Sequence, residues 1–407
     1  MKRGHLSQYF SGVASKTLSV VETNPSVSHQ HEFNGVNSLI GILGPDHGDT
    51  VRIPAKFVYM ADEDEPTWTA DCPVSWYDSR RNHPTRSEYR LYFPANEVMN
   101  QAAEGDLLVV GQRQDRSLLI IVVESGSTTE SQMRWLFGLE NVQGRYQLKS
   151  EAETDEIDLS FSARLILEEL GFDSVEPEPD YLDEMLKRFG GTFPQTAVFS
   201  TFARETLTDL NSLSDPDSTI VAWLEREEAL FRTLERHIVS ERLEDGFAGD
   251  VDSFISFSLS VHNRRKSRAG FALENHLEAV FQEHGLRYSR EQITENRAKP
   301  DFLFPSVDDY QNVASPSQFL TMLGVKQSCK DRWRQVLSEA HRISEKHLLT
   351  FEPGISVNQT GEMRSHHLQL IVPRSIQPSY QPSQQAWLMN LAEFLELLHE
   401  REKHFGK

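Results

Sequence analysis

The sequence predicts two domains of different class, a β-rich domain in residues 1–175 and a mixed α/β domain in residues 201–407. Short β-branched and aromatic runs, separated by turn residues, fill the first part. Helical apolar spacing, followed by strands that alternate with helices, fills the second part. The length of 407 residues also suits two or three domains rather than one.

The N-terminal part is expected to form a small barrel, because it carries many short strands at close spacing. Turn residues such as Gly44-Pro45-Asp46 and Glu104-Gly105-Asp106 separate the strands. The predicted strands are Val36–Leu43, Val51–Met60, Tyr89–Phe93, Leu107–Gly111 and Leu118–Val123.

The middle of the chain is acidic and is predicted to connect the two domains. Residues 151–158 are expected to be exposed, and Phe161–Leu170 has the apolar spacing of a helix. We place the linker at residues 176–200, because Pro177 and Pro179 cannot continue a helix and the charges around them resist burial.

The C-terminal part begins with helices and then alternates. Leu224–Ile238 and Phe271–His284 have helical apolar spacing. This order predicts a mixed central sheet with helices packed against it. The expected strands are Phe302–Phe304, Phe319–Lys326, His347–Phe351 and Leu368–Val372, and the expected later helices are Arg332–Lys346 and Trp387–His399.

The charge distribution limits how the chain could bind nucleic acid. A formal net charge of -20 argues against a diffuse polycation, because phosphate contacts need lysine and arginine. The charge is uneven, however, since residues 151–184 hold many acids and one base, Arg164. Basic residues gather at 80–90, 264–268 and 326–334, so DNA would be bound in defined grooves.

Several classes of protein are disfavoured. Cys72 and Cys329 give neither a disulfide framework nor zinc-binding spacing. No apolar run approaches the length of a membrane span, and none follows the charged N-terminus as a signal peptide would. We therefore expect a cytoplasmic protein without a membrane partner.

Asp301 and Lys326 are the candidate catalytic pair. Hydrolysis of a phosphodiester uses a metal ion held by carboxylates, and Mg²⁺ prefers such hard oxygen ligands. A nearby lysine can position the nucleophile and offset charge in the transition state. A second acid often stands two residues before the lysine, but that position is Gly324. Glu339 is the first candidate to replace it and Glu274 the second, with Asp301 and Glu339 as metal ligands.

Each of these residues also has an ordinary structural interpretation. Asp301 after a proline could be a turn residue, Lys326 a solvated residue at a strand end, and Glu339 a surface glutamate. The combination favours a nuclease site.

Lys330, Asp331 and Arg332 are candidates for reading bases. Arginine and lysine can donate to guanine, and aspartate can accept from cytosine N4. If residues 332–346 form one helix, Arg332 and Glu339 lie on the same face. The alternative is a charged helix start capped by Asp331, with solvated lysine and arginine side chains around it.

The residues of this region resemble the catalytic domain of the EcoRII-like type II restriction endonucleases. The resemblance covers about residues 255–375. It rests on Asn263–Gly270, Leu273-Glu274, His284–Arg287, Ile293–Glu295, Lys299–Pro305, Val325-Lys326 and Cys329–Gln335.

The resemblance implies a PD-(D/E)-x-K nuclease fold, Mg²⁺ as the sole cofactor, and a homodimer. The substrate would be double-stranded DNA cut at a short site containing CC/GG, similar to CCWGG. It also implies that the helix residue Glu339 replaces the missing strand acid and that Lys330, Asp331 and Arg332 contact the C·G pairs. The central base pair would be flipped out. Arg264 and Arg268, in the basic cluster, are further candidate DNA contacts.

The N-terminal half resembles, more weakly, the B3-like pseudobarrel that binds a second, effector copy of DNA in this family and represses the nuclease until it is occupied. The candidate DNA contacts are Arg80, Arg81, Arg86 and Arg90, of which Arg86 and Arg90 would share one strand face with Glu88. An ordinary solvated face is the alternative. Two other functions stay open: a methylation-dependent endonuclease whose N-terminal domain reads modified cytosine, and a non-catalytic DNA-binding repressor.

Overall fold

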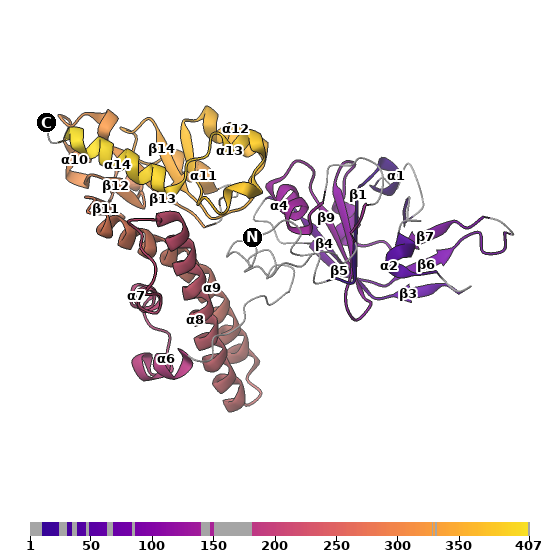
Figure 1. The fold of residues 1–407 in the computed structure, drawn as a ribbon. Helices are drawn as coiled ribbons and strands as arrows, with labels where there is room; N and C mark the ends of the chain where they lie inside the picture. Colours follow the sequence, from indigo (N-terminus) through magenta and orange to yellow (C-terminus); the bar gives the residue numbers. More distant parts are fainter. Residues whose placement is uncertain are drawn as a thin grey trace. The chain divides into compact units, whose positions relative to one another are not determined.

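The chain folds into two compact units, seen in the computed structural model drawn in Figure 1. One unit holds residues 1–158 and 354–359, and the other holds residues 159–353 and 360–407. The structure describes residues 10–23, 31–34, 39–45, 49–62, 68–83, 86–139, 147–149, 181–327, 329 and 332–405.

The N-terminal unit is built on two sheets, a six-stranded one and a four-stranded one. All hydrogen-bonded neighbours are antiparallel except β4 and β9, which are parallel. The larger sheet has the order β10 (Gln147–Lys149), β1 (Gly12–Thr17), β8 (Leu107–Gln112), β9 (Leu118–Val123), β4 (Ala55–Met60) and β5 (Trp68–Asp71). The smaller one has the order β2 (Glu32–Phe33), β7 (Tyr89–Tyr92), β6 (Val74–Asp78) and β3 (Val51–Ile53). The β-rich class is as predicted, and closure into a B3-like pseudobarrel stays a prediction.

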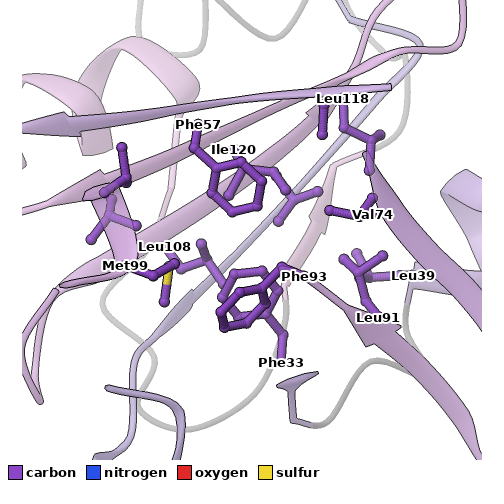
Figure 2. Packing of buried hydrophobic residues seen from close by; sticks show 14 of the residues in the cluster. Phe33, Leu39, Phe57, Val74, Leu91, Phe93, Met99, Leu108, Leu118 and Ile120 are labelled. Atoms are coloured by element: carbon purple, nitrogen blue, oxygen red, sulfur yellow. The ribbon is translucent and has the colours of Figure 1, made fainter. Parts of the chain in front are cut away.

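One apolar cluster joins strands of both sheets (Figure 2). Phe57, Leu108 and Ile120 from the larger sheet meet Trp76 and Leu91 from the smaller one, and all five are fully buried. Residues on the opposite face of β9 are buried as well. This burial explains why β9 is a continuous apolar run rather than an alternating one.

Two of the predicted N-terminal strands differ in the structure. Ile40–Leu43, the described end of the predicted strand Val36–Leu43, is the short helix α2. The predicted strand Val51–Met60 is two strands, β3 and β4, which belong to different sheets. Pro54 stands between them and cannot donate a backbone hydrogen bond to a strand partner. The other helices of this unit are α1 (Val20–Thr23), α3 (Glu97–Gln101) and α4 (Thr128–Phe137).

The C-terminal unit begins with four helices that pack against one another. They are α6 (Leu182–Phe189), α7 (Thr196–Glu205), α8 (Pro216–Asp245) and α9 (Val251–Glu283). Met185 of α6 and Phe199 of α7 are buried in a cluster with Leu230 of α8. The described part of the predicted linker, residues 181–200, is therefore folded rather than extended. The predicted helix Phe161–Leu170 and residues 176–180 of the linker lie outside the described residues.

A mixed five-stranded sheet forms the centre of this unit, as predicted. Its first three strands are antiparallel neighbours and its last three are parallel. Their order is β11 (Ser289-Arg290), β12 (Phe302–Phe304), β13 (Thr321–Val325), β14 (Lys346–Leu349) and β15 (Leu368–Ile371). The later helices are α10 (Val307–Gln311), α11 (Trp333–Leu337), α12 (Val357–Ser365), α13 (Pro382–Gln385) and α14 (Leu391–Phe405).

Helices cover both faces of the sheet. On one face, the ring of Phe281 from α9 lies 5.1 Å from that of Phe302, and Phe394 of α14 lies 5.2 Å from His347. On the other face, the methyl groups of Val336 from α11 lie directly over Gly324. The end of β13, and Lys326 after it, is therefore framed by α9 on one side and α11 on the other.

Two predicted helices differ in extent. The predicted helix Arg332–Lys346 is only α11, which ends at Leu337, and a turn follows before β14. The predicted helix Trp387–His399 begins four residues later, as α14. Among the described helices, none is long and apolar enough to cross a bilayer.

Candidate active site

Asp301 and Lys326 meet at the junction of β12 and β13. Phe302 pairs with Leu323, so the residue before β12 and the residue after β13 lie at the same end of the sheet. Lys326 Nζ lies 3.0 Å from Asp301 Oδ2, and the Val325 N–H donates to that same oxygen at 2.6 Å. Both side chains are partly exposed, at 23% for Lys326 and 14% for Asp301, so a ligand from solvent can reach them.

Glu274 approaches this pair from α9. The residue is 9% exposed, and Arg290 of β11 donates to its Oε2 at 3.0 Å. Burial, and then the negative charge of Asp301, raise the pKa of Glu274 to about 7, although Arg290 opposes this. The effect of Asp301 on its pKa indicates that the two carboxylates belong to one electrostatic site.

Glu339 approaches from the other face, on the turn after α11. Its N–H donates to Val336 O, and the next residue, Ala340, has a left-handed φ of 46°. Burial and the charge of Asp301 raise the pKa of Glu339 to about 7, while Lys326 and Lys346 lower it. The predicted helix position of Glu339 is therefore wrong, but the side chain still comes into the field of Asp301. Arg332 and Glu339 do not share a helix face.

Gly324 shows why no acid stands two residues before Lys326. A Cβ atom built on Gly324 would lie 2.9 Å and 3.1 Å from the two methyl carbons of Val336. A carboxylate side chain at this strand position would collide with α11 unless the helix moved. A second acid of the candidate site would therefore have to come from another element.

The donor set fits a hard divalent cation in its chemistry. Asp301, Glu274 and Glu339 offer carboxylate oxygens, and Glu339 Oε2 is buried without a hydrogen-bond partner among the described residues. Burial, and then the charge of Asp301, raise the pKa values of the two glutamates, and a cation would offset that charge. In the described part of the chain, however, no three His, Cys, Asp or Glu side chains are already gathered as a metal site. Asp301 is instead bonded to Lys326 and Glu274 to Arg290.

Two cationic residues near the candidate site, Arg290 and Lys346, were not predicted from the sequence. Arg290 lies on the short strand β11, and Lys346 begins β14 with its Nζ 2.9 Å from Ile343 O. Burial lowers the pKa of Lys346, and Glu339 opposes that shift. Each looks like an ordinary surface residue in the sequence, and only strand pairing could have indicated that they face the acids.

The three candidate base-reading residues are only partly described. Arg332 is exposed and directly precedes α11. Lys330 and Asp331 lie outside the described residues. Cys329, between them and Lys326, is buried and free, and its N–H donates to the carboxylate of Glu352.

The basic cluster of α9 is only partly available to DNA. Arg264 is exposed, and its guanidinium lies 4.4 Å from the ring centroid of Phe193. Arg268 is 6% exposed and pairs with Glu227 and Glu228 of α8. The structure contradicts the predicted DNA contact at Arg268, because its guanidinium is enclosed between helices.

The four candidate arginines of the N-terminal unit fall into two groups. Arg90 of β7 pairs with Glu32 and Glu88, and Arg80 pairs with Glu88. Arg80, Arg81 and Arg86 are exposed, and Arg90 is partly buried. Arg86 and Glu88 both precede β7, so only Arg90 of the predicted alternating set is a strand residue.

The C-terminal part of the chain is similar to known proteins. Residues 231–395 match the family described as EcoRII C terminal. The type II restriction enzyme EcoRII of Escherichia coli is 46% identical over 186 residues, which are 46% of this chain and 46% of that enzyme. The chain thus matches about half the length of this relative. The expected resemblance to the EcoRII-like enzymes is confirmed for this part of the chain.

Solved structures of restriction endonucleases are more distant. The complex of PspGI with substrate DNA is 15% identical, covers 52% of this chain and 94% of its own, and has a TM-score of 0.44. Metal-depleted Ecl18kI in complex with uncleaved DNA is 17% identical, covers 56% of this chain and 87% of its own, and has a TM-score of 0.45.

Proposed function

We propose that this protein is a type II restriction endonuclease that hydrolyses phosphodiester bonds of double-stranded DNA with Mg²⁺. The observation that carries the proposal is the 3.0 Å contact between Asp301 and Lys326, inside a domain that is 46% identical to EcoRII. Glu274 and Glu339 add two carboxylates to the same electrostatic site.

The residues of the site have distinct roles in this proposal. Asp301 and Glu339 would hold Mg²⁺, which supplies Lewis-acid polarisation of the phosphate and lowers the pKa of bound water. Lys326 orients the attacking water and offsets the negative charge that develops on the phosphate. Glu274 and Glu339, with pKa values of about 7, can each accept or hold a proton near neutral pH.

The resemblance supports a more specific substrate. Arg332, with Lys330 and Asp331, would read G·C pairs in the major groove of a CCWGG-like site. A two-fold symmetric site calls for a two-fold symmetric reader, so the active form would be a homodimer. Arg264 adds a phosphate contact from the exposed side of α9.

The N-terminal unit would bind a second DNA copy as an activating effector. Arg80, Arg81 and Arg86, which are exposed, are better candidates for its phosphate contacts than Arg90, which is partly buried and pairs with Glu32 and Glu88. Binding of modified cytosine by this unit is the alternative, and it would make the enzyme methylation-dependent.

Plasmid cleavage tests the proposal. The wild-type protein is expected to cut plasmid DNA in Mg²⁺, whereas Asp301→Ala and Lys326→Ala should bind the site in Ca²⁺ and fail to cut. Loss of one transition-state donor costs on the order of 10²–10³-fold in rate. Cleavage by either variant at the wild-type rate would remove the mechanism, and no cleavage by the wild type would favour a DNA-binding repressor.

Matched methylated and unmethylated plasmids separate the two roles of the N-terminal unit. Cleavage of unmethylated DNA that is stimulated by a second, unlabelled duplex supports the effector role. Cleavage confined to the methylated plasmid supports the modification-dependent reading.

A further inference from the structure

Arg290 connects α9 to the strand next to Asp301. Its Nη1 donates to Asn275 Oδ1 at 2.9 Å and to Glu278 Oε2 at 2.7 Å. Its Nη2 donates to Glu274 Oε2 at 3.0 Å. One guanidinium thus binds three side chains on neighbouring turns of the same helix. Lysine, with a single nitrogen, cannot span such a set.

The backbone around Arg290, like the Arg290 side chain, is bonded to residues next to the candidate site. Arg290 pairs with Phe302 across β11 and β12, and its guanidinium lies 5.9 Å from the centroid of that ring. The next residue, Glu291, donates its N–H to Asp301 O at 3.1 Å. The position of Arg290, and of whatever it holds, is therefore tied to that of Asp301.

Glu274 needs such a partner. A carboxylate that is 9% exposed carries a large desolvation cost unless it is paired. The other charged groups that act on Glu274 are Asp301 and Glu291, which have the same sign. Without Arg290, the Glu274 side chain would lose the contact that holds it against these charges.

We propose that Arg290 is a positioning residue that holds the Glu274 carboxylate beside Asp301, as the third carboxylate of the site. This inference rests on the proposed nuclease function. Arg290 itself touches neither DNA nor metal in this role and acts through Glu274. It also assigns Glu274 to the catalytic site. The absence of an acid at Gly324 did not decide which glutamate belongs there.

The experiment measures metal binding and cleavage separately in the full-length protein. Mn²⁺ binding without DNA is followed by calorimetry, and single-turnover cleavage is followed in Mg²⁺. Arg290→Gln is expected to lower both by about 10–100-fold, the usual effect of removing the partner of a site carboxylate. Arg290→Lys should restore part of the loss, because it keeps the charge but not the three-way contact.

A double-variant cycle separates positioning from general support of the fold. In a Glu274→Gln background, Arg290→Gln should add little further loss, because its target is already gone. Arg287→Gln is the matched control, because Arg287 lies three residues before Arg290 and is 56% exposed. It pairs with Glu402 of α14 and not with Glu274. This variant should leave both measurements unchanged.

Two results would overturn the inference while leaving the nuclease intact. One is an Arg290→Gln variant that binds Mn²⁺ and cuts as well as Arg287→Gln. The other is an equal loss from Arg290→Gln in the wild-type and Glu274→Gln backgrounds. A wild-type protein that neither binds Mn²⁺ nor cuts DNA would instead sink the proposed function.

Discussion

Two clusters of charged residues in the C-terminal unit look alike in sequence but differ in the structure. At the candidate site, burial and then the charge of Asp301 raise the pKa values of Glu274 and Glu339 to about 7. Between α8 and α9, buried Glu227 is matched by Arg268 and by His276, whose Nε2 lies 2.9 Å from Glu227 Oε2.

The second cluster, which we call the interhelix cluster, is enclosed between helices. Glu227 and His276 are fully buried, and Arg204 Nη1 lies 3.1 Å from His276 Nδ1. The pKa of Glu227 is lowered, although burial raises it, because His276 and Arg268 outweigh the burial. Charge matched in this way holds helices together, whereas at the candidate site burial and Asp301 raise the pKa values of both glutamates although Arg290, Lys326 and Lys346 oppose this.

The largest effect expected from this contrast is on stability. Arg268→Met leaves Glu227 and Glu228 buried without their shared cation, and removal of one partner of a buried pair costs about 3–5 kcal/mol. Lys326→Met, at a partly exposed pair, should change the free energy of unfolding by far less. Chemical denaturation of both variants checks this. Equal losses would show that the two clusters do not differ as argued.

Gly324 gives the next largest effect and tests why the site takes its acid from a turn. Gly324→Ala puts a Cβ within 3.1 Å of both methyl carbons of Val336, and overpacking of this kind costs roughly 1–3 kcal/mol. Val336→Ala in the same chain should recover part of the loss, because it removes the colliding methyls. Denaturation of the two single variants and the double variant measures the coupling. Simple additivity of their effects would refute the steric explanation.

The same residues show what the sequence could predict. Asp301 and Lys326 could be paired in advance, because each follows or precedes an apolar run and neighbouring strands bring such ends together. The mixed sheet followed from the same alternation. Glu339 was assigned to a helix because nothing in an alanine indicates the left-handed conformation of Ala340 that ends the turn.

The predicted DNA contact at Arg268 was wrong for a different reason. A run of arginines on a helix looks the same whether it faces DNA or a buried acid, and its partner Glu227 lies 41 residues away on another helix. The resemblance to a DNA-cutting family gave the run a function that only the packing of α8 on α9 could correct. The division of the predicted strand Val51–Met60 could have been predicted from the sequence. Pro54 lies between β3 and β4, and its missing N–H limits strand pairing there.

The smallest expected effect is on how stability depends on pH, which should differ between Glu339 of the candidate site and Glu227 of the interhelix cluster. The pKa of Glu339 is raised from 4.5 to about 7, so the folded protein binds more protons than the unfolded chain between these values. The stability that this group contributes is present below pH 4.5 and is lost as the pH rises to 7. Glu339→Gln should therefore stabilise the metal-free protein at pH 8, by on the order of 1 kcal/mol after solvent screening, and lose this advantage by pH 5.

Glu227→Gln is the matched control, because the pKa of Glu227 is shifted the other way. A lowered pKa contributes stability above the unfolded value of 4.5, so this variant should be destabilised at pH 8 and at pH 5 alike. Thermal unfolding of both variants at the two pH values, with chelator present, gives the comparison. A Glu339→Gln variant that is destabilised at pH 8 would mean that the Glu339 carboxylate is as well stabilised by its neighbours as that of Glu227, and the two clusters would then not differ in this respect.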